Sequence, residues 1–315
     1  MIYPLKNKPG IRLIKLLHLY SYFIALLVVI AGSLGSCNKF DGPQTIPAYL
    51  KIDTIFQYTN YNLQGENSHN ITDLWIYLDD QQIGVFEIPA MFPILADGKH
   101  KLEIRPGVKV NGISSTRAPY PMLKPIVYEE FDFHPDSIQE LNNLTFKYYD
   151  NVTFAWIEDF EQSSITIQET SNSDTAIKRT LPSNNPEAYL SNTSLHSGQI
   201  NVTVDKPYYS GWSLFAYELP KLESPVILEL DYKTDTYVTV GLFVHYPGGY
   251  ESKPLIVLNH SDEWKHIYIN FTPTVSQHAN AIDYKVHFEA GRETGSTKSN
   301  IYLDNIKLTY RDNNQ

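Results

Sequence analysis

The chain has 315 residues, a formal net charge of −10 and a single cysteine. This charge argues against a nucleic-acid partner, because binding to phosphates requires a basic surface. One cysteine excludes an internal disulfide and a cysteine metal cluster, so the folded part must be stabilised by apolar burial alone. Residues that favour β-structure recur in short runs between Gly, Pro, Asn, Asp and Ser, which is typical of β-sandwiches.

The amino-terminal segment has the layout of an export signal. A basic stretch between Lys6 and Lys15 precedes an apolar run from Leu16 to Leu34. This run is just long enough to cross a bilayer, so an uncleaved transmembrane anchor is the alternative interpretation. Removal of the leader would take away four basic residues and move the formal net charge to −14.

The tetrapeptide Leu34-Gly35-Ser36-Cys37 favours cleavage, because it resembles the bacterial lipobox. It predicts a lipoprotein signal peptide over residues 1–36, lipid on Cys37 and a polar tether over residues 37–45. The lipid chains would make a membrane the first partner of the protein. Asn38 follows the cysteine, and the sorting rule of other bacterial lipoproteins then implies outer-membrane residence, with the body at the cell surface or on the periplasmic face.

The first β unit is predicted over residues 46–135. Leu74 to Leu78 alternates between two faces, and a polar turn leads into Ile83 to Phe86, which indicates a hairpin. Further strands are predicted from Ala48 to Phe56 and from Ile126 to Phe133. This number of short strands predicts a small sandwich of immunoglobulin-like (Ig-like) size. The aromatic and proline-rich loop from Val110 to Pro121 is interpreted as a packing element.

The second unit is predicted to be a larger β-sandwich of jelly-roll size over residues 149–312. Its predicted strands are Val226–Tyr232, Tyr237–Tyr246, Trp264–Phe271, Tyr284–Ala290 and Ile301–Tyr310. In the last strand the apolar face changes phase between Leu303 and Ile306, which predicts a β-bulge near Asp304-Asn305. The expected fold class is therefore all-β, with two sandwiches in tandem.

Four segments of the second unit resemble the galactose-binding-like jelly rolls of carbohydrate-binding modules. They are Glu158–Glu161, Leu195–Val202, Glu263–Ile269 and Ile301–Ile306. The whole layout resembles surface lipoproteins of the Bacteroidetes that carry an Ig-like domain before a jelly roll. In the resembled jelly rolls, a glutamate near the first strand and an aspartate in the last strand hold a structural calcium. The resemblance implies that Glu161 and Asp304 have this role, as hard oxygen ligands.

Two segments offer the aromatic faces and polar groups that sugar binding needs. Residues 207–212 contain Tyr208, Tyr209 and Trp212, and residues 245–251 contain Tyr246 and Tyr250. The pair Gly248-Gly249 indicates a turn that presents Tyr250. Packing at the edge of the core is the alternative role for these aromatics, and Trp264 is predicted to lie in the core.

Evidence for catalysis is weak. Glu229 and Asp231 share one face of a strand, as in some jelly-roll glycosidases, but Lys233 occupies the place of the third acid, so both are predicted to be surface residues. His287 and Glu289 lack a third metal ligand. We expect a non-catalytic lipoprotein that binds a polysaccharide or oligosaccharide. The alternatives are a structural or adhesion lipoprotein with an envelope protein partner and, more distantly, a carbohydrate-active enzyme.

Overall fold

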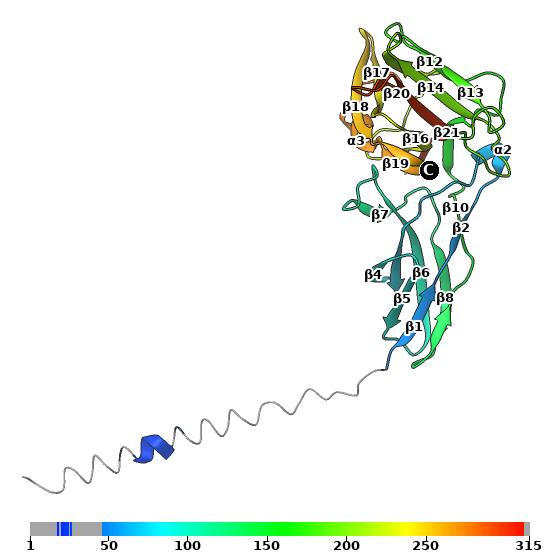
Figure 1. Cartoon of the computed structure of the whole chain (residues 1–315). Coiled ribbons are helices and arrows are strands. Elements are labelled where there is room, and N and C mark those ends of the chain that lie inside the picture. The colour runs from blue at the N-terminus through cyan, green and yellow to red at the C-terminus, as the bar shows by residue number, and fades with distance from the viewer. Residues whose placement is uncertain (1–17, 19, 25, 27–45, 312–315) are drawn as a thin grey trace, which may run out of the picture. The chain divides into compact units, whose positions relative to one another are not determined.

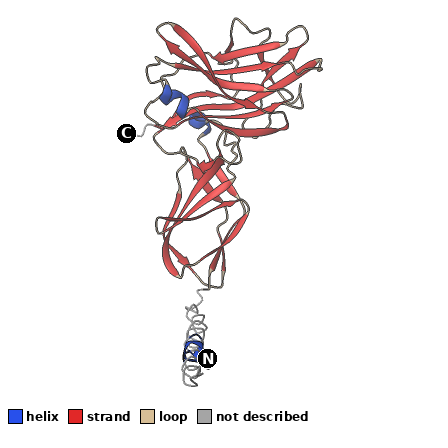
Figure 2. Ribbon diagram, turned by 90° about the vertical axis from the view of Figure 1, so that its left-hand side faces the viewer, coloured by secondary structure: helices blue, strands red, loops and turns tan. Residues whose placement is uncertain are grey.

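The computed structural model describes residues 46–311, together with residues 18, 20–24 and 26. The predicted cleavage site, Cys37 and the tether lie outside the described residues. No helix within the described part of the chain is both long and apolar enough to cross a bilayer. Residues 48–311 form one compact unit. Within this unit the structure is almost entirely β, which confirms the predicted fold class (Figures 1 and 2).

The N-terminal sandwich packs a sheet of strand order β4-β3-β6-β7, with β8 also on β6, against a β5-β1-β9 sheet and a β10-β2 pair. Its strands are β1 (Ala48–Ile52), β2 (Ile55–Tyr58), β3 (Asp73–Leu78), β4 (Gln81–Glu87), β5 (Ala90–Ile94), β6 (Gly98–Lys109), β7 (Arg117–Pro119), β8 (Ile126–Phe133), β9 (Ile138–Glu140) and β10 (Leu144–Lys147), and its short helix is α2 (Tyr61–Gln64). Alternate residues such as Leu50, Ile76 and Ile104 are fully buried between the sheets.

Two details of this sandwich differ from the sequence prediction. The strand expected from Ala48 to Phe56 is interrupted after Ile52, and its two halves pair with different partners. The short strands β9 and β10 follow residue 135 and pair in parallel with β1 and β2. The N-terminal sandwich therefore continues to Lys147.

The second sandwich consists of two sheets. Sheet I has the order β13-β14-β21-β16-β19, with β11 also on β21, and sheet II has the order β12-β15-β20-β17-β18. The elements are β11 (Val152–Glu158), β12 (Ile167–Glu169), β13 (Ile177–Thr180), β14 (Ser197–Thr203), β15 (Tyr208–Ser213), β16 (Val226–Thr234), β17 (Val238–Tyr246), β18 (Gly249–Leu258), β19 (Ser261–Asn270), α3 (Thr272–Gln277), β20 (Tyr284–Gly291) and β21 (Lys298–Arg311). All five predicted strands are present. Their inward residues form one apolar core between the sheets.

The predicted irregularities of this sandwich are confirmed. The pairing of β16 with β21 shifts register between Glu229 and Asp231, opposite Asn305, whose backbone φ is 50°. This is the expected bulge, and it keeps both Leu303 and Ile306 in the core. The Gly248-Gly249 turn closes the β17–β18 hairpin and sets His245 opposite Tyr250.

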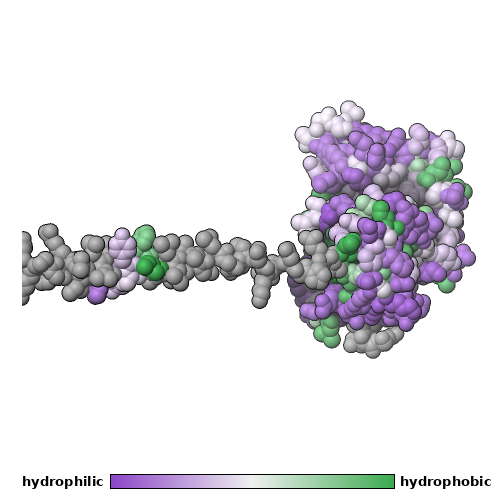
Figure 3. Space-filling view, turned by 90° about the horizontal axis from the view of Figure 1, so that it is seen from below, coloured by the Kyte–Doolittle hydropathy of each residue, from purple (hydrophilic) through white to green (hydrophobic). Residues whose placement is uncertain are grey.

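The proline-rich loop of the N-terminal sandwich lies against sheet I. Val110 forms a parallel bridge with Tyr268, and the Asn111 N–H donates to the Tyr268 carbonyl at 2.8 Å. The side-chain oxygen of Asn111 accepts a hydrogen bond from the Asn270 N–H at 2.8 Å. Packing, the predicted role of this loop, is thus confirmed. The exterior seen in Figure 3 is mainly hydrophilic, with small separate apolar patches.

Candidate functional site

The outer face of sheet II gathers aromatic side chains from three strands. In β15 the side-chain alternation puts Tyr208, Ser210 and Trp212 on this face, and Tyr209 on the core side. Antiparallel pairing then sets Trp212 beside His287 of β20, and His287 beside Gly241 of β17. The face is therefore built by strand register and not by a flexible loop.

Trp212 lies at the centre of this aromatic face. Its ring meets Phe243 edge-on at 5.2 Å between centroids and Tyr250 in a tilted arrangement at 5.5 Å. The Lys285 ammonium lies 4.4 Å from the centre of the indole, and burial lowers the pKa of this lysine. The indole Nε1 is buried and has no hydrogen-bond partner among residues 46–311. A buried indole N–H normally has an acceptor, and this one lacks one within the described part of the chain.

Two histidines lie among these rings, and of them His245 is partly exposed whereas His287 is buried. His245 stacks on Tyr250 at 4.3 Å, and its Nδ1 lies 3.1 Å from the Asp283 carboxylate. His287 lies 4.2 Å from the ring of Phe243 and 3.1 Å from Glu289. Burial lowers the pKa of His287. Rings with polar groups at their edges can contact both the apolar face and the hydroxyls of a sugar.

Ser210, His287 and Glu289 do not form a catalytic relay. Ser210 Oγ lies 3.2 Å from His287 Nε2, and Glu289 Oε1 approaches the same nitrogen at 3.1 Å. In a serine hydrolase the acid and the serine use opposite nitrogens of the histidine, because the acid must orient the ring for proton transfer. This arrangement is suited to holding the imidazole in place and not to activating Ser210.

The structure separates the five aromatics predicted to bind sugar. Tyr208, Trp212 and Tyr250 lie on the outer face of sheet II, and Tyr250 is 38% exposed. Tyr209 is a correction, because it is fully buried in the core and offers no face to a ligand. Tyr246 packs against the core and its hydroxyl lies 2.7 Å from His278 Nδ1. Consecutive residues of a strand point to opposite sides, so both tyrosines could not share the face with their neighbours.

Sequence reasoning missed Phe243, Lys285 and His287 as members of this face. Each sits on a predicted strand, and Phe243 is two residues before His245. The sequence signal for these three residues was the alternation of side chains within each strand. That signal identifies a shared face only when the pairing of β17 with β20 is known. Gly241, also on this face, lies at a register shift of β17 against β18, and a Cβ there would meet the Lys253 carbonyl at 2.3 Å. Only glycine fits so close an approach.

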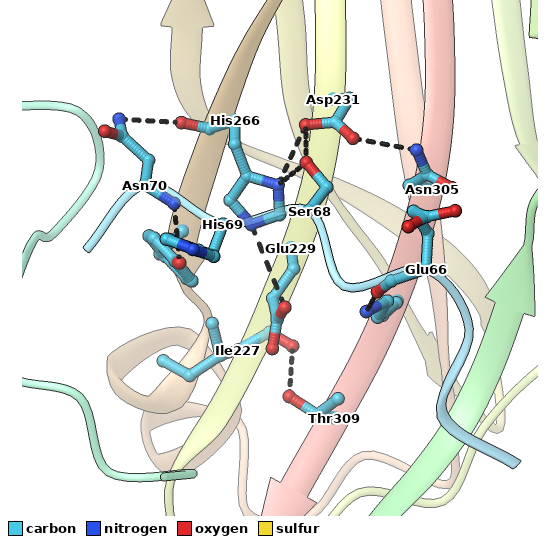
Figure 4. A network of polar contacts seen from close by, with 12 residues as sticks. Glu66, Ser68, His69, Asn70, Ile227, Glu229, Asp231, His266, Asn305 and Thr309 are labelled. Carbon is cyan, nitrogen blue, oxygen red and sulfur yellow. Dashed lines mark hydrogen bonds and ion pairs between the residues drawn. The ribbon is translucent and has the colours of Figure 1, made fainter. Parts of the chain in front are cut away.

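The interpretation of Glu229 and Asp231 as surface acids is wrong. They are 0% and 2% exposed, because the N-terminal sandwich covers this part of sheet I (Figure 4). Glu229 accepts hydrogen bonds from the hydroxyls of Tyr120 and Tyr148. Burial raises the pKa of both tyrosines well above the ordinary value, which keeps them neutral donors. Glu229 is thus enclosed and has no access to a substrate.

Asp231 belongs to the same junction. It accepts hydrogen bonds from Ser68 Oγ and Asn305 Nδ2, both at 2.8 Å, and lies 2.9 Å from His266 Nδ1 (Figure 4). Ser68 belongs to the N-terminal sandwich, and the other three residues belong to sheet I. These contacts make the two carboxylates part of the connection between the sandwiches.

Trp264 is also a correction, because it does not lie in the core. Its indole Nε1 donates to the Glu187 carbonyl at 3.0 Å, and its ring meets Tyr189 edge-on at 5.1 Å. It stands on the outer face of sheet I, on the same side of β19 as His266 and Tyr268, whereas Ile267 and Ile269 point into the core.

Glu161 and Asp304, the predicted calcium ligands, hold the same segment from two sides. Glu161 accepts hydrogen bonds from the Leu195 and His196 N–H groups at 2.6 Å and lies 2.9 Å from His196 Nδ1. Asp304 accepts a hydrogen bond from Ser194 Oγ at 2.9 Å. Protein donors thus already occupy both carboxylates, and the described residues contain no group of three or more His, Cys, Asp or Glu side chains arranged to hold a metal. Calcium stays a prediction, tested as follows.

If calcium bridges Glu161 and Asp304, chelation should lower the melting temperature. An ion that binds only the folded state, at a concentration a hundredfold above its Kd, stabilises that state by about 2.7 kcal/mol. For a domain of this size, each kcal/mol shifts the melting temperature by about 2–4 °C. Asp304→Asn keeps the side-chain shape and should abolish the effect of the chelator in a thermal melt followed by circular dichroism. Superimposable melts of the original chain with calcium and with chelator would rule the site out.

No protein-family profile and no curated protein sequence matches this chain. Among solved structures it is similar to the CBM22-2 xylan-binding domain of Xyn10C from Paenibacillus barcinonensis, with 13% identity and a TM-score of 0.37 over 50% of this chain and 99% of that one. It is also similar to the family 11 carbohydrate-binding module of the cellulase Lic26A-Cel5E of Clostridium thermocellum, with 15% identity and a TM-score of 0.32 over 49% and 92%. A variant of the family 29 module CBM29-2 complexed with mannohexaose has 13% identity and a TM-score of 0.33 over 50% and 92%. With TM-scores below 0.5, these similarities do not decide the function of this chain.

Proposed function

We infer that this chain is a membrane-anchored lipoprotein whose second sandwich binds a glycan without catalysis. The observation that carries this proposal is the aromatic face of sheet II, where Trp212 contacts both Phe243 and Tyr250 on the outside of the sandwich. An apolar patch of this kind on the protein surface, with polar side chains at its edge, suits a ligand that has both apolar and hydroxyl-bearing sides.

The non-catalytic part of the proposal rests on two arrangements. Ser210 and Glu289 share one nitrogen of His287, so no relay is formed. Glu229 and Asp231, the acid pair that most resembles a glycosidase motif, are enclosed at the junction between the sandwiches. Neither pair is placed to protonate a glycosidic oxygen.

The experiment for this proposal is a glycan array probed with the full chain in detergent. Binding to polysaccharides is expected, and Tyr250→Ala should reduce it, because this residue is the most exposed ring of the face. A matched control is Tyr58→Ala, which removes an exposed tyrosine, 55% accessible, from the N-terminal sandwich. Absence of binding to the whole array, or binding that Tyr250→Ala and Trp212→Ala both leave intact, would contradict the proposal.

The anchoring part of the proposal rests on the lipobox that ends at Cys37. Cys37→Ala should abolish labelling by a fatty-acid analogue and leave an unprocessed or soluble product, because the thiol is the acceptor of the lipid. The measurement is the labelling, mass and membrane retention of the expressed chain. Unchanged mass and retention in the variant would show that a retained apolar segment holds the chain instead. Protease treatment of intact cells would then place the body at the surface or in the periplasm.

A further inference from the structure

A hollow lies on the outer face of sheet I, on the part that the N-terminal sandwich leaves uncovered. It has a volume of about 390 Å³ and is formed by the ends of β16, β19 and β21 together with the segment between β13 and β14. This volume lies in the range of small-molecule sites. Sheet I therefore carries a candidate site of its own, separate from the aromatic face of sheet II.

Tyr302 lines this hollow and brings a hydrogen-bond donor to it. Its side chain is 6% exposed, and its phenol oxygen accepts hydrogen bonds from Asn185 Nδ2 at 3.1 Å and from Gln199 Nε2 at 3.2 Å. Within residues 46–311 the phenol proton has no acceptor of its own. A buried phenol that accepts two amide hydrogen bonds and donates none has an unused donor, and a hydroxyl oxygen of a ligand would satisfy it.

Two aromatic rings form a wall at the rim of the hollow, outside the residues that line it. The ring of Trp264 lies 6.3 Å from that of Tyr302, and Tyr189 meets Trp264 edge-on. The hydrogen bond from Trp264 Nε1 to the Glu187 carbonyl fixes the orientation of the indole. The segment between β13 and β14 thus holds the wall in place, and no rearrangement is needed to form it.

The remaining groups at the hollow define the charge of its ligand. Three carboxylates, those of Glu187, Asp235 and Asp262, face one ammonium, that of Lys233, which is already paired with Glu187. Asp235 is occupied by the N–H and the side-chain amide of Asn300 at 2.7 and 2.9 Å. Asp262 has no hydrogen-bond partner within the described part of the chain and is an open acceptor. The formal charge of −2 disfavours uronates, sulfates and phosphates.

We propose that this hollow is a second saccharide site, which takes an uncharged sugar unit through the Tyr302 hydroxyl and the Asp262 carboxylate, with the ring of Trp264 at its rim. The site deepens the proposed function, because it would give one chain two glycan contacts on opposite sheets. Its chemistry does not depend on the first face. Two weak sites on one chain raise the avidity for a polymer that reaches both, without any new contact.

The experiment is hydrogen–deuterium exchange of the full chain in detergent, with cellotriose, xylotriose and mannotriose as neutral probes and trigalacturonic acid as the anionic one. At least one neutral probe should protect residues 231–236, 259–265 and 298–303, and the anionic probe should not. Asp262→Ala should raise the probe concentration that is needed for this protection about tenfold, because an ionic hydrogen-bond acceptor is lost. Trp264→Ala removes the wall and is the second variant. Asp205→Ala, at an exposed acid between β14 and β15, is the matched control.

The outcomes separate this site from the proposed function. Protection only over residues 208–213 and 243–251 would overturn the second site and leave the aromatic face of sheet II in place. Protection only over sheet I would support the hollow and overturn the proposed role of sheet II. Protection of sheet I that persists unchanged in both Asp262→Ala and Trp264→Ala would overturn the assignment, as would protection by the anionic probe or by none of the probes.

Discussion

Replacing Lys307 with alanine should lower the free energy of unfolding by about 3–5 kcal/mol, the usual cost of leaving a buried charge uncompensated. Lys307 is fully buried in β21, opposite Glu229 of β16. Its ammonium donates to the Glu66 carbonyl and lies 5.7 Å from the centre of the Tyr148 ring. Burial lowers the pKa of Lys307, and the charges of Glu229, Asp231 and Glu66 oppose this effect. Alanine would leave the two strand carboxylates without their buried cation.

Lys307 lies between the two sandwiches. A Cβ added at Gly65 would lie 3.2 Å from Lys307 Cε, so the chain of the N-terminal sandwich passes close to the lysine stem. Thermal and urea unfolding of the full chain should show the loss as a drop in the midpoint, at about 2–4 °C per kcal/mol in the thermal experiment. Lys99→Ala is the control, because the exposed pair of Lys99 with Glu130 contributes about 0–1 kcal/mol.

A companion variant, Lys307→Met, keeps most of the stem and removes the charge. If the charge balance at the junction is what matters, methionine should destabilise nearly as much as alanine. If packing of the stem matters more, methionine should recover most of the stability. A destabilisation by Lys307→Ala no larger than that of Lys99→Ala would contradict the role of the junction.

Trp212→Ala should weaken glycan binding by about 30-fold or more, since loss of a central anchor residue costs about 2 kcal/mol or more. The indole provides apolar area, an unused N–H and the contacts that position Phe243 and Tyr250. Its removal would also take away the contact of the Lys285 ammonium with the ring. The variant therefore loses both a ligand contact and the order of the neighbouring rings.

Titration calorimetry with the best glycan from the array is the measurement for Trp212→Ala. Phe56→Ala, at an exposed aromatic of the N-terminal sandwich, should leave the affinity unchanged. Trp212→Phe retains a ring without the N–H, so an intermediate affinity would separate the hydrogen bond from the apolar contact. Equal affinity of the original chain and Trp212→Ala would remove sheet II from the binding site.

Local patterns in the sequence were sufficient for most of the fold. The run of residues from Ile126 to Phe133 predicted β8 with its observed bounds, and the phase change in the last strand predicted the bulge that the φ of Asn305 confirms. Both features can be recognised within the sequence of a single strand. Tyr209 shows the limit of this approach, because a run of two tyrosines does not reveal which of them faces the core.

The buried junction could not be predicted from the sequence. Glu229, Asp231 and Lys307 have the composition of solvent-exposed strand positions, and the residues that cover them, such as Ser68 and Tyr120, lie more than a hundred positions away along the chain. Their burial is a tertiary property, decided by how the two sandwiches pack. The aromatic face was predicted only in part, for a related reason. Trp212 and Tyr250 were recognised by their residue types, whereas Phe243 is brought to the face only by strand pairing.

The bridge between Val110 and Tyr268 has a consequence for how copies of the chain meet one another. β19 is the edge strand of sheet I, and an open edge invites strand addition from a neighbouring molecule. Asn111 occupies the Tyr268 carbonyl and the Asn270 N–H, so the ladder is closed over this stretch. If the chain is anchored to a membrane as proposed, its copies would be concentrated in one plane. A loop that blocks edge-to-edge pairing would there keep neighbouring copies from aggregating through this strand.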